Sequence, residues 1–107
     1  MQKHIYTISE ITSLSAPIFK KNKITNAYIF GSYARGTANE TSDIDFLVDI
    51  EGSNVKSLLG LGAIYCELED VFKKRIDLIT TGSLEQKANM PSDLEFRKRV
   101  LAERIQL

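Results

Sequence analysis

Three aspartates interrupt segments that otherwise have the composition of buried strands. Asp43 and Asp45 stand at the start of the apolar run 44–50, and Asp77 interrupts the run 75–80. Residues two apart in a strand face the same side, so Asp43 and Asp45 project together. Adjacent carboxylates repel each other, and a divalent cation with oxygen ligands relieves that repulsion. The pattern predicts a metal site at Asp43 and Asp45. Asp77 joins this site if its strand pairs beside the strand that carries Asp45. Solvated carboxylates at strand ends are the alternative interpretation.

A glycine-rich segment precedes the paired aspartates and follows a short apolar run. Its sequence is GSYARG, residues 31–36, and its two glycines allow a tight turn that approaches a ligand closely. Backbone N–H groups in such a turn bind phosphate, and Ser32 and Arg35 can add hydrogen bonds. The glycine spacing is that of a P-loop, but Thr37 stands where the P-loop lysine belongs. The turn and the aspartates together suggest the two halves of a nucleotide site.

The longer stretch GSYARGTANETSDIDFLV, residues 31–48, resembles the signature of the nucleotidyltransferase superfamily with a DNA polymerase β-type palm. That signature is a Gly-Ser turn followed at fixed spacing by Asp-x-Asp. The Arg-Gly pair after the turn and Ser42 before Asp43 resemble the minimal nucleotidyltransferases, small stand-alone domains often encoded beside a HEPN-domain toxin. The resemblance covers nearly the whole chain, from the leading helix to the closing one.

The resemblance implies a role for each matching residue. The aspartates would hold two magnesium ions, with manganese as an alternative metal, and ATP would be the substrate. Asp77 would also activate the attacking hydroxyl group. The implied nucleotide-binding residues are Gly31, Ser32, Arg35 and Ser42, and the implied catalytic and metal-binding residues are Asp43, Asp45 and Asp77.

Members of this family transfer AMP from ATP to a tyrosine of the partner HEPN toxin and thereby block its ribonuclease. The resemblance therefore implies an antitoxin that forms a hetero-oligomer with a cognate HEPN-domain toxin. Two other classes stay open. One is a non-catalytic binding module that neutralises a toxin by complex formation. The other is nucleotidyl transfer to a small molecule such as an aminoglycoside, or to RNA, although those enzymes generally carry an additional domain.

Length and composition favour a single domain over residues 1–107, and the resemblance implies that it is a nucleotidyltransferase domain. Lys and Arg number 14, and so do Asp and Glu, so the formal charge is zero and extended nucleic-acid binding is not expected. No apolar run is long enough to span a bilayer, and the N-terminus lacks a signal-peptide core, so we expect a cytoplasmic protein without membrane contact. The single Cys66 excludes an internal disulfide, and its neighbours suggest a small buried thiol.

The sequence of the first half of the chain predicts one helix and two strands, followed by a second helix. Thr7 and Glu10 have the spacing of a capping box, and Pro17 predicts a kink or an early end in the helix that follows. Residues 27–30 and 44–50 read as strands. The turn EGSN comes next, and it offers Ser53 or Asn54 as the cap of a second helix.

The second half predicts a third strand at residues 75–80, a short helix at 83–90 and a last helix. Ser92 and Glu95 repeat the capping-box spacing, and this last helix is expected to reach about Arg104. The order of elements indicates an α/β or α+β fold, in which helices pack on a small mixed sheet. The resemblance specifies the palm-like nucleotidyltransferase version of that fold.

Overall fold

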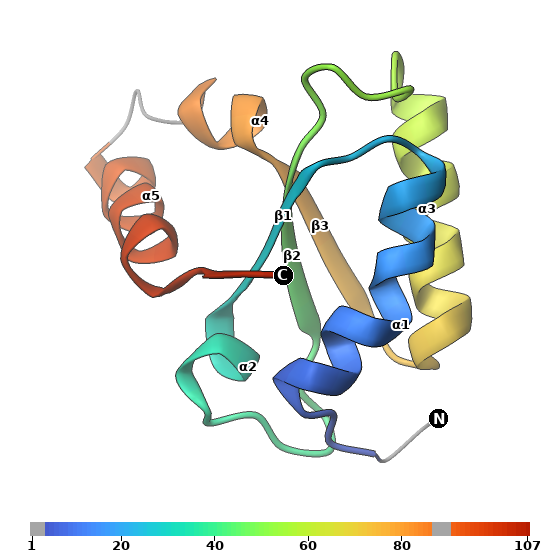
Figure 1. The fold of residues 1–107 in the computed structure, drawn as a ribbon. Coiled ribbons are helices and arrows are strands. Elements are labelled where there is room, and N and C mark those ends of the chain that lie inside the picture. Colours follow the sequence, from blue (N-terminus) through green and yellow to red (C-terminus); the bar gives the residue numbers. More distant parts are fainter. Residues whose placement is uncertain (1–3, 87–90) are drawn as a thin grey trace.

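A computed structural model describes residues 4–86 and 91–107, and it shows a four-stranded mixed sheet between two layers of helices (Figure 1). The strand order is β3-β2-β1-β4; β2 and β3 run parallel, and the other neighbours are antiparallel. This arrangement confirms the predicted fold class. The elements are α1 Ile8–Lys21, β1 Asn26–Phe30, α2 Gly31–Arg35, β2 Ile44–Asp49, α3 Leu58–Phe72, β3 Ile76–Thr80, α4 Thr81–Gln86, α5 Pro91–Glu103 and β4 Ile105–Gln106.

The two faces of the sheet carry separate apolar clusters. Helices α1 and α3 cover one face, which we call the α1–α3 face, and α4 and α5 cover the other, the α4–α5 face (Figure 1). Phe46 packs in the larger cluster with α1 and α3, whereas its neighbour Leu47 packs with Leu84 and Val100 on the opposite face. Side chains along β2 therefore alternate between two cores, which holds this strand rigidly from both sides.

Helix α1 begins with the predicted capping box. The Glu10 N–H donates to Thr7 Oγ1 at 3.0 Å, and the Thr7 N–H donates to Glu10 Oε1 at 2.8 Å. The prediction that this helix could end early at Pro17 was wrong, since α1 continues through this residue to Lys21. Pro17 lies on the exposed side of α1, where water can satisfy the carbonyl that loses its partner, while Ile18 and Phe19 hold the last turns against the core.

The second long helix begins later than the sequence suggested. Helix α3 starts at Leu58, and its cap is Ser57, whose hydroxyl accepts the Gly60 N–H at 3.3 Å. Ser53 instead lies buried in the preceding loop, where its hydroxyl donates to the Ile50 carbonyl at 2.6 Å. The prediction of Ser53 or Asn54 as the cap was wrong, because Ser53 closes the turn after β2.

Several smaller predictions need correction in the C-terminal half. Helix α4 follows β3 directly at Thr81 rather than starting at residue 83, and residues 87–90 of the predicted short helix lie outside the described residues. Helix α5 begins at Pro91, so Ser92 lies inside the helix and not at its cap. Cys66 is exposed on α3, so the expectation of a buried thiol was also wrong. Strand β4 was not predicted, because two residues carry no periodic signal.

Within residues 4–86 and 91–107, no helix is both long enough and apolar enough to cross a bilayer.

Candidate functional site

The parallel pairing of β2 with β3 places two of the three aspartates side by side. Asp45 is the register partner of Asp77, and Asp43 lies immediately before β2 begins. The alternation of the strands turns Asp45 away from Ile44 and Ile76, which are buried on the α1–α3 face. The predicted meeting of the second and third strands is therefore confirmed, and it brings Asp77 to the paired aspartates.

The neighbouring carboxylates change the chemistry of Asp45. Partial burial, together with the negative charges of Asp77 and Asp43, raises the pKa of Asp45 to about 7 from its ordinary value of 3.8. The Arg35 guanidinium opposes this rise, and the Glu103 carboxylate adds to it. A carboxyl group that titrates near neutrality, surrounded by other carboxylates, is a functional-site signal with a physical cause.

Gly31 lies in contact with Asp45 at the junction of β1 and α2. Its φ of +74° is in the left-handed region that favours glycine, and a Cβ atom at this position would overlap Asp45 Oδ2. Two constraints therefore require glycine here, the backbone conformation and the space that Asp45 occupies. The structure thus brings the glycine turn and the aspartates into one site, as the sequence suggested.

The Gly-Ser segment is a short helix rather than an open turn. Helix α2 runs from Gly31 to Arg35, and its C-cap residue Gly36 has the left-handed conformation with a φ of +78°. The N-cap residue Phe30 supplies no side-chain hydrogen bond to the first turn of α2. N–H groups at a helix start attract anions, because the helix itself leaves them without a backbone partner.

Arg35 is held by the end of α5. Its Nη1 donates to Glu103 Oε2 at 2.9 Å and to Oε1 at 3.2 Å, across 68 positions of the sequence. Glu103 was not identified from the sequence, and no local pattern marks it. Its nearness to the site depends on how α5 packs against α2, which only the tertiary structure shows. The predicted contact of Arg35 with nucleotide stays a prediction.

A compact turn precedes Asp43 and fixes the direction from which it enters the site. Ser42 Oγ accepts the Asn39 N–H at 2.9 Å, and the Ser42 N–H donates to the Asn39 carbonyl at 3.1 Å. The buried Lys74 Nζ donates to the Glu40 carbonyl at 2.6 Å in the same turn. Ser42 therefore has a structural partner in this turn, and its predicted nucleotide contact stays a prediction. The sequence did not single out Lys74.

The donor set fits a magnesium ion that completes its coordination with substrate. Carboxylate oxygens are the ligands that magnesium prefers. Burial raises the pKa of Asp45 most, and a divalent cation would remove the carboxylate repulsion that adds to this rise. Across residues 4–86 and 91–107, no three acidic, histidine or cysteine side chains already converge on one cation position. Phosphate oxygens and water would therefore supply the remaining ligands.

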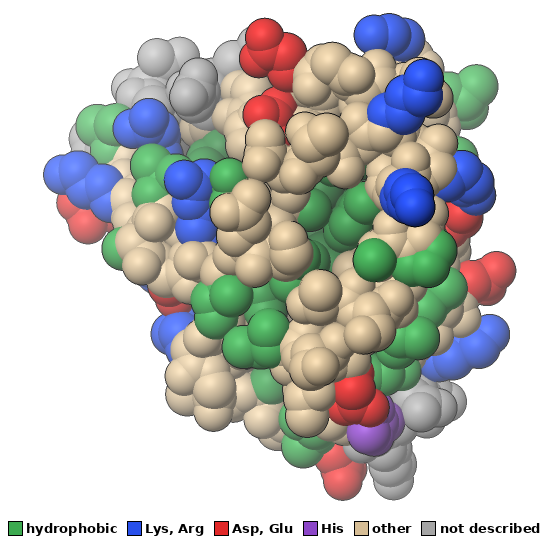
Figure 2. All heavy atoms as spheres, in the orientation of Figure 1, with side chains coloured by type: hydrophobic (Ala, Val, Ile, Leu, Met, Phe, Trp, Pro, Cys, Tyr) green, Lys and Arg blue, Asp and Glu red, His purple; other side chains and the backbone are tan. Residues whose placement is uncertain are grey.

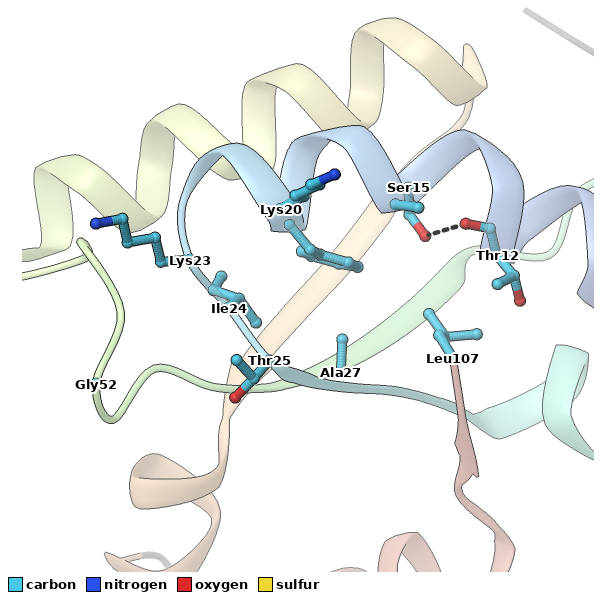
Figure 3. Close-up of a pocket in the computed structure, with 11 residues that line it drawn as sticks. Thr12, Ser15, Lys20, Lys23, Ile24, Thr25, Ala27, Gly52 and Leu107 are labelled. Carbon is cyan, nitrogen blue, oxygen red and sulfur yellow. Dashed lines mark hydrogen bonds between the residues drawn. The ribbon is translucent and has the colours of Figure 1, made fainter.

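A cavity of about 570 Å³ lies elsewhere, between α1, β1 and Leu107 on the α1–α3 face. Figure 2 shows the hollow in this side of the molecule, with hydrophobic side chains at its floor. In the close-up, Ala27 and Leu107 lie opposite Ser15 of α1 (Figure 3). None of the predicted site residues lines this cavity, so it is separate from the aspartates.

Comparison with known proteins identifies relatives of this chain. A family model described as a nucleotidyltransferase domain matches residues 15–106. A relative from Methanocaldococcus jannaschii, named "Putative protein adenylyltransferase MJ0435", is 47% identical over 78 residues, which cover 72% of this chain and 81% of the relative.

Solved structures show the same fold. One described as "Structure of putative minimal nucleotidyltransferase" has a TM-score of 0.65 at 25% identity, and the match covers 95% of this chain and 97% of that one. Another, described as "Crystal structure of the toxin-antitoxin with AMP-PNP", has a TM-score of 0.63 at 22% identity, covering 88% of this chain and 69% of that one. At 22% identity the second likeness concerns the fold alone.

Proposed function

Because this chain belongs to the nucleotidyltransferase domain family, we propose that it transfers AMP from ATP to a tyrosine hydroxyl of a cognate HEPN-type ribonuclease toxin and so acts as its antitoxin. The observation that carries this proposal is the contact between Gly31 and Asp45. It joins a segment suited to phosphate with carboxylates suited to a metal. The relative named as a putative protein adenylyltransferase supports AMP transfer to a protein. The toxin–antitoxin structure with AMP-PNP shares the fold, and it is the reason that we propose a toxin as the partner.

The first part of the proposal concerns binding. The N–H groups at the start of α2, with the Ser32 hydroxyl, would bind the nucleotide phosphates. Asp43, Asp45 and Asp77 would hold magnesium, which neutralises phosphate charge and polarises the phosphorus under attack. Arg35 would add a charged hydrogen bond to a phosphate oxygen once ATP competes with Glu103 for its guanidinium.

The second part concerns the chemical step. The toxin tyrosine oxygen forms a bond to the α-phosphorus of ATP, and the bond from that phosphorus to the bridging oxygen of pyrophosphate breaks. Asp77 accepts the proton of the tyrosine hydroxyl, because it is exposed beside Asp45 and can meet an incoming side chain. The N–H groups of α2 stabilise the negative charge that accumulates on pyrophosphate.

The test is AMP transfer to a cognate HEPN-type toxin. Purified toxin, ATP labelled on its α-phosphate and magnesium should give a labelled toxin whose mass rises by one or more AMP units, with release of pyrophosphate. Transfer should stop when a chelator removes the metal and should return when magnesium or manganese is added back. Transfer that resists the chelator would contradict the metal site.

A non-catalytic antitoxin would give a different result in the same assay. The toxin's ribonuclease would then be inhibited in the absence of ATP, and Asp43→Ala would leave the inhibition intact. Under the proposal, inhibition requires ATP and is lost with Asp43→Ala, although the two proteins still associate. Ribonuclease activity and complex formation should therefore be measured on the same samples.

The role of Arg35 has its own test, because Glu103 competes for it. Glu103→Gln removes the charge that holds Arg35 and should strengthen ATP binding by about two- to fivefold, in line with the small energies of partly exposed ion pairs. Arg35→Gln should weaken ATP binding. Calorimetric titration with a non-hydrolysable ATP analogue measures both variants. Unchanged affinity in Arg35→Gln would remove Arg35 from the nucleotide site.

A further inference from the structure

Helix α3 exposes an uncharged surface at its N-terminal half. Leu58 and Leu59 are each 86% exposed, the highest values among the exposed large hydrophobic residues of the described chain. From Leu58 to Cys66 the sequence LLGLGAIYC contains no charged residue. A solvated helix face normally carries charges, and adjacent exposed leucines indicate a contact surface for protein.

Part of this surface points directly away from the core. Positions three or four apart share one side of a helix, and α3 packs against the sheet through Ile64, Leu68 and Phe72. The exposed residues on the opposite side form what we call the α3 outer face: Leu59, Gly62, Ala63 and Cys66. Helix α3 runs along the outside of the molecule, and no helix or strand among the residues that the structure describes covers this side of it (Figure 1).

We propose that the α3 outer face binds the same face of a second copy of this chain, with the two α3 helices antiparallel. The twofold axis would pass between Gly62 and Ala63, because these small residues let two helix backbones approach closely. In this register Leu59 lies against the partner's Cys66, and the reverse contact follows from the symmetry. Each exposed leucine then packs beside a small side chain rather than against another leucine.

The charges at the two ends of the α3 outer face favour a second copy of this chain as the partner and an antiparallel direction of the two helices. Lys56 is exposed just before α3, and Glu69 and the exposed Asp70 lie near its other end. The antiparallel register places the start of α3, with Lys56 just before it, near the partner's Glu69 and Asp70. A parallel register would instead bring Lys56 to the partner's Lys56. The helix dipoles also attract one another in the antiparallel arrangement and repel in the parallel one.

The proposed contact is compatible with the site and does not depend on its function. Helix α3 covers the α1–α3 face, whereas Asp45 and Asp77 belong to the α4–α5 face. Pairing through α3 therefore leaves both copies of the site open. The ion pair from Lys21 Nζ to Glu67 Oε2, which ties α1 to α3 at 2.5 Å, also stays within one copy.

The first experiment measures the oligomeric state of the full chain by sedimentation equilibrium. We expect a monomer–dimer equilibrium that Leu59→Asp weakens by at least about a hundredfold, since the substitution removes two buried leucines per dimer and adds repelling charges. The matched control is Leu14→Asp on α1, where the leucine is 39% exposed. It should leave the equilibrium unchanged. Circular dichroism should show that both variants stay folded, because both positions are exposed.

The second experiment tests the register with cysteine chemistry. In Leu59→Cys, the introduced thiol should form a disulfide with the partner's Cys66 under a mild oxidant, giving a covalent dimer with two bonds. Within one chain these positions are about 10 Å apart along the helix, which is too far for a disulfide. Wild-type protein should not crosslink, because the antiparallel register separates Cys66 from the partner's Cys66 by a similar distance.

Three results would overturn the proposal. A chain that stays monomeric at 100 μM or so, with no crosslink in Leu59→Cys, has no such dimer. If wild-type protein crosslinks through Cys66 as readily as the Leu59→Cys variant does, the two helices pair in a different register. If the wild-type chain is monomeric on its own and the Leu59→Asp variant no longer binds the toxin, the α3 outer face binds the toxin instead.

Discussion

Strands β2 and β3 serve two different purposes on their two faces. On the α1–α3 face they present Ile44, Phe46 and Ile76, which are buried in the larger apolar cluster. On the α4–α5 face, one residue along each strand, they present Asp45 and Asp77 side by side. The same backbone therefore carries side chains selected for packing and side chains that packing does not explain.

The difference shows how a small domain can hold repelling charges in a defined place. Alternation fixes each aspartate by burying its neighbours, so the carboxylates cannot move apart without disturbing the core. Burial is the largest cause of the raised pKa of Asp45, and the enforced proximity of Asp77 and Asp43 adds to it. The contrast predicts that substitutions of these aspartates change activity and spare stability, whereas substitutions of the buried residues on the α1–α3 face reduce stability.

The largest effect is expected at Asp45. Asp45→Asn should reduce AMP transfer to background while the protein stays folded, since the variant would lose a proposed metal ligand and would relieve a repulsion. The matched control is Asp49→Asn on the same strand. Asp49 Oδ1 accepts the Glu51 N–H at 3.0 Å, and an asparagine oxygen can replace it. Transfer by Asp49→Asn should remain near wild type. An Asp45→Asn variant that unfolds would mean that this residue is structural.

On the opposite face, Phe46→Ala should destabilise the fold by about 3–5 kcal/mol, as expected for removing a fully buried ring. Urea denaturation followed by circular dichroism measures the change in the free energy of unfolding. At temperatures where the variant stays folded, its transfer rate should remain within about threefold of wild type. A stable Phe46→Ala variant that has lost activity would break the division between the two faces.

Asp77→Asn should slow the chemical step by about a hundredfold or more, the usual contribution of a general base. The substitution keeps the size of the side chain but removes its charge and basicity. ATP binding should persist through Gly31, Ser32, Asp43 and Asp45. Single-turnover transfer and calorimetric ATP titration separate the two quantities. Near-normal transfer would leave a site that works with two aspartates.

The smallest effect is a pH dependence of stability. Asp45 has a folded pKa of about 7, above its ordinary value of 3.8, so between these values the folded state binds more protons than the unfolded state. Its contribution to stability is therefore greatest at acidic pH and is lost as pH rises towards 7. In the presence of a chelator, Asp45→Asn should gain stability over wild type at pH 8 but much less at pH 5. Parallel stability curves for the two proteins would contradict this.

Much of the site was predictable because its signals are local. The Asp-x-Asp spacing puts Asp43 and Asp45 on one side of a strand wherever that strand lies. Gly31 and Ser32 follow β1 directly, and the capping box of α1 needs only Thr7 and Glu10. Such features depend on residues within a few positions of one another, so they can be read before the fold is known.

Other features depended on which elements pack together. Ser53 and Ser57 are equally good caps by composition, and the loop decided between them by burying Ser53 after β2. Cys66 has apolar neighbours, but its position on α3 turns it to solvent. In both cases residue type gave the wrong answer, because burial depends on the orientation of the whole element.

The sequence alone determined which residues could do chemistry and how they are spaced along the chain, namely the glycine segment 31–36 and the aspartates Asp43, Asp45 and Asp77. Only the tertiary structure decided that Asp77 lies beside Asp45, that Asp45 lies against Gly31, and that Glu103 holds Arg35. These contacts join residues far apart in the chain, so their formation follows from strand pairing and helix packing. Local propensity does not encode such long-range pairing, because the free energy of the pairing comes from burying whole faces of strands and helices at once.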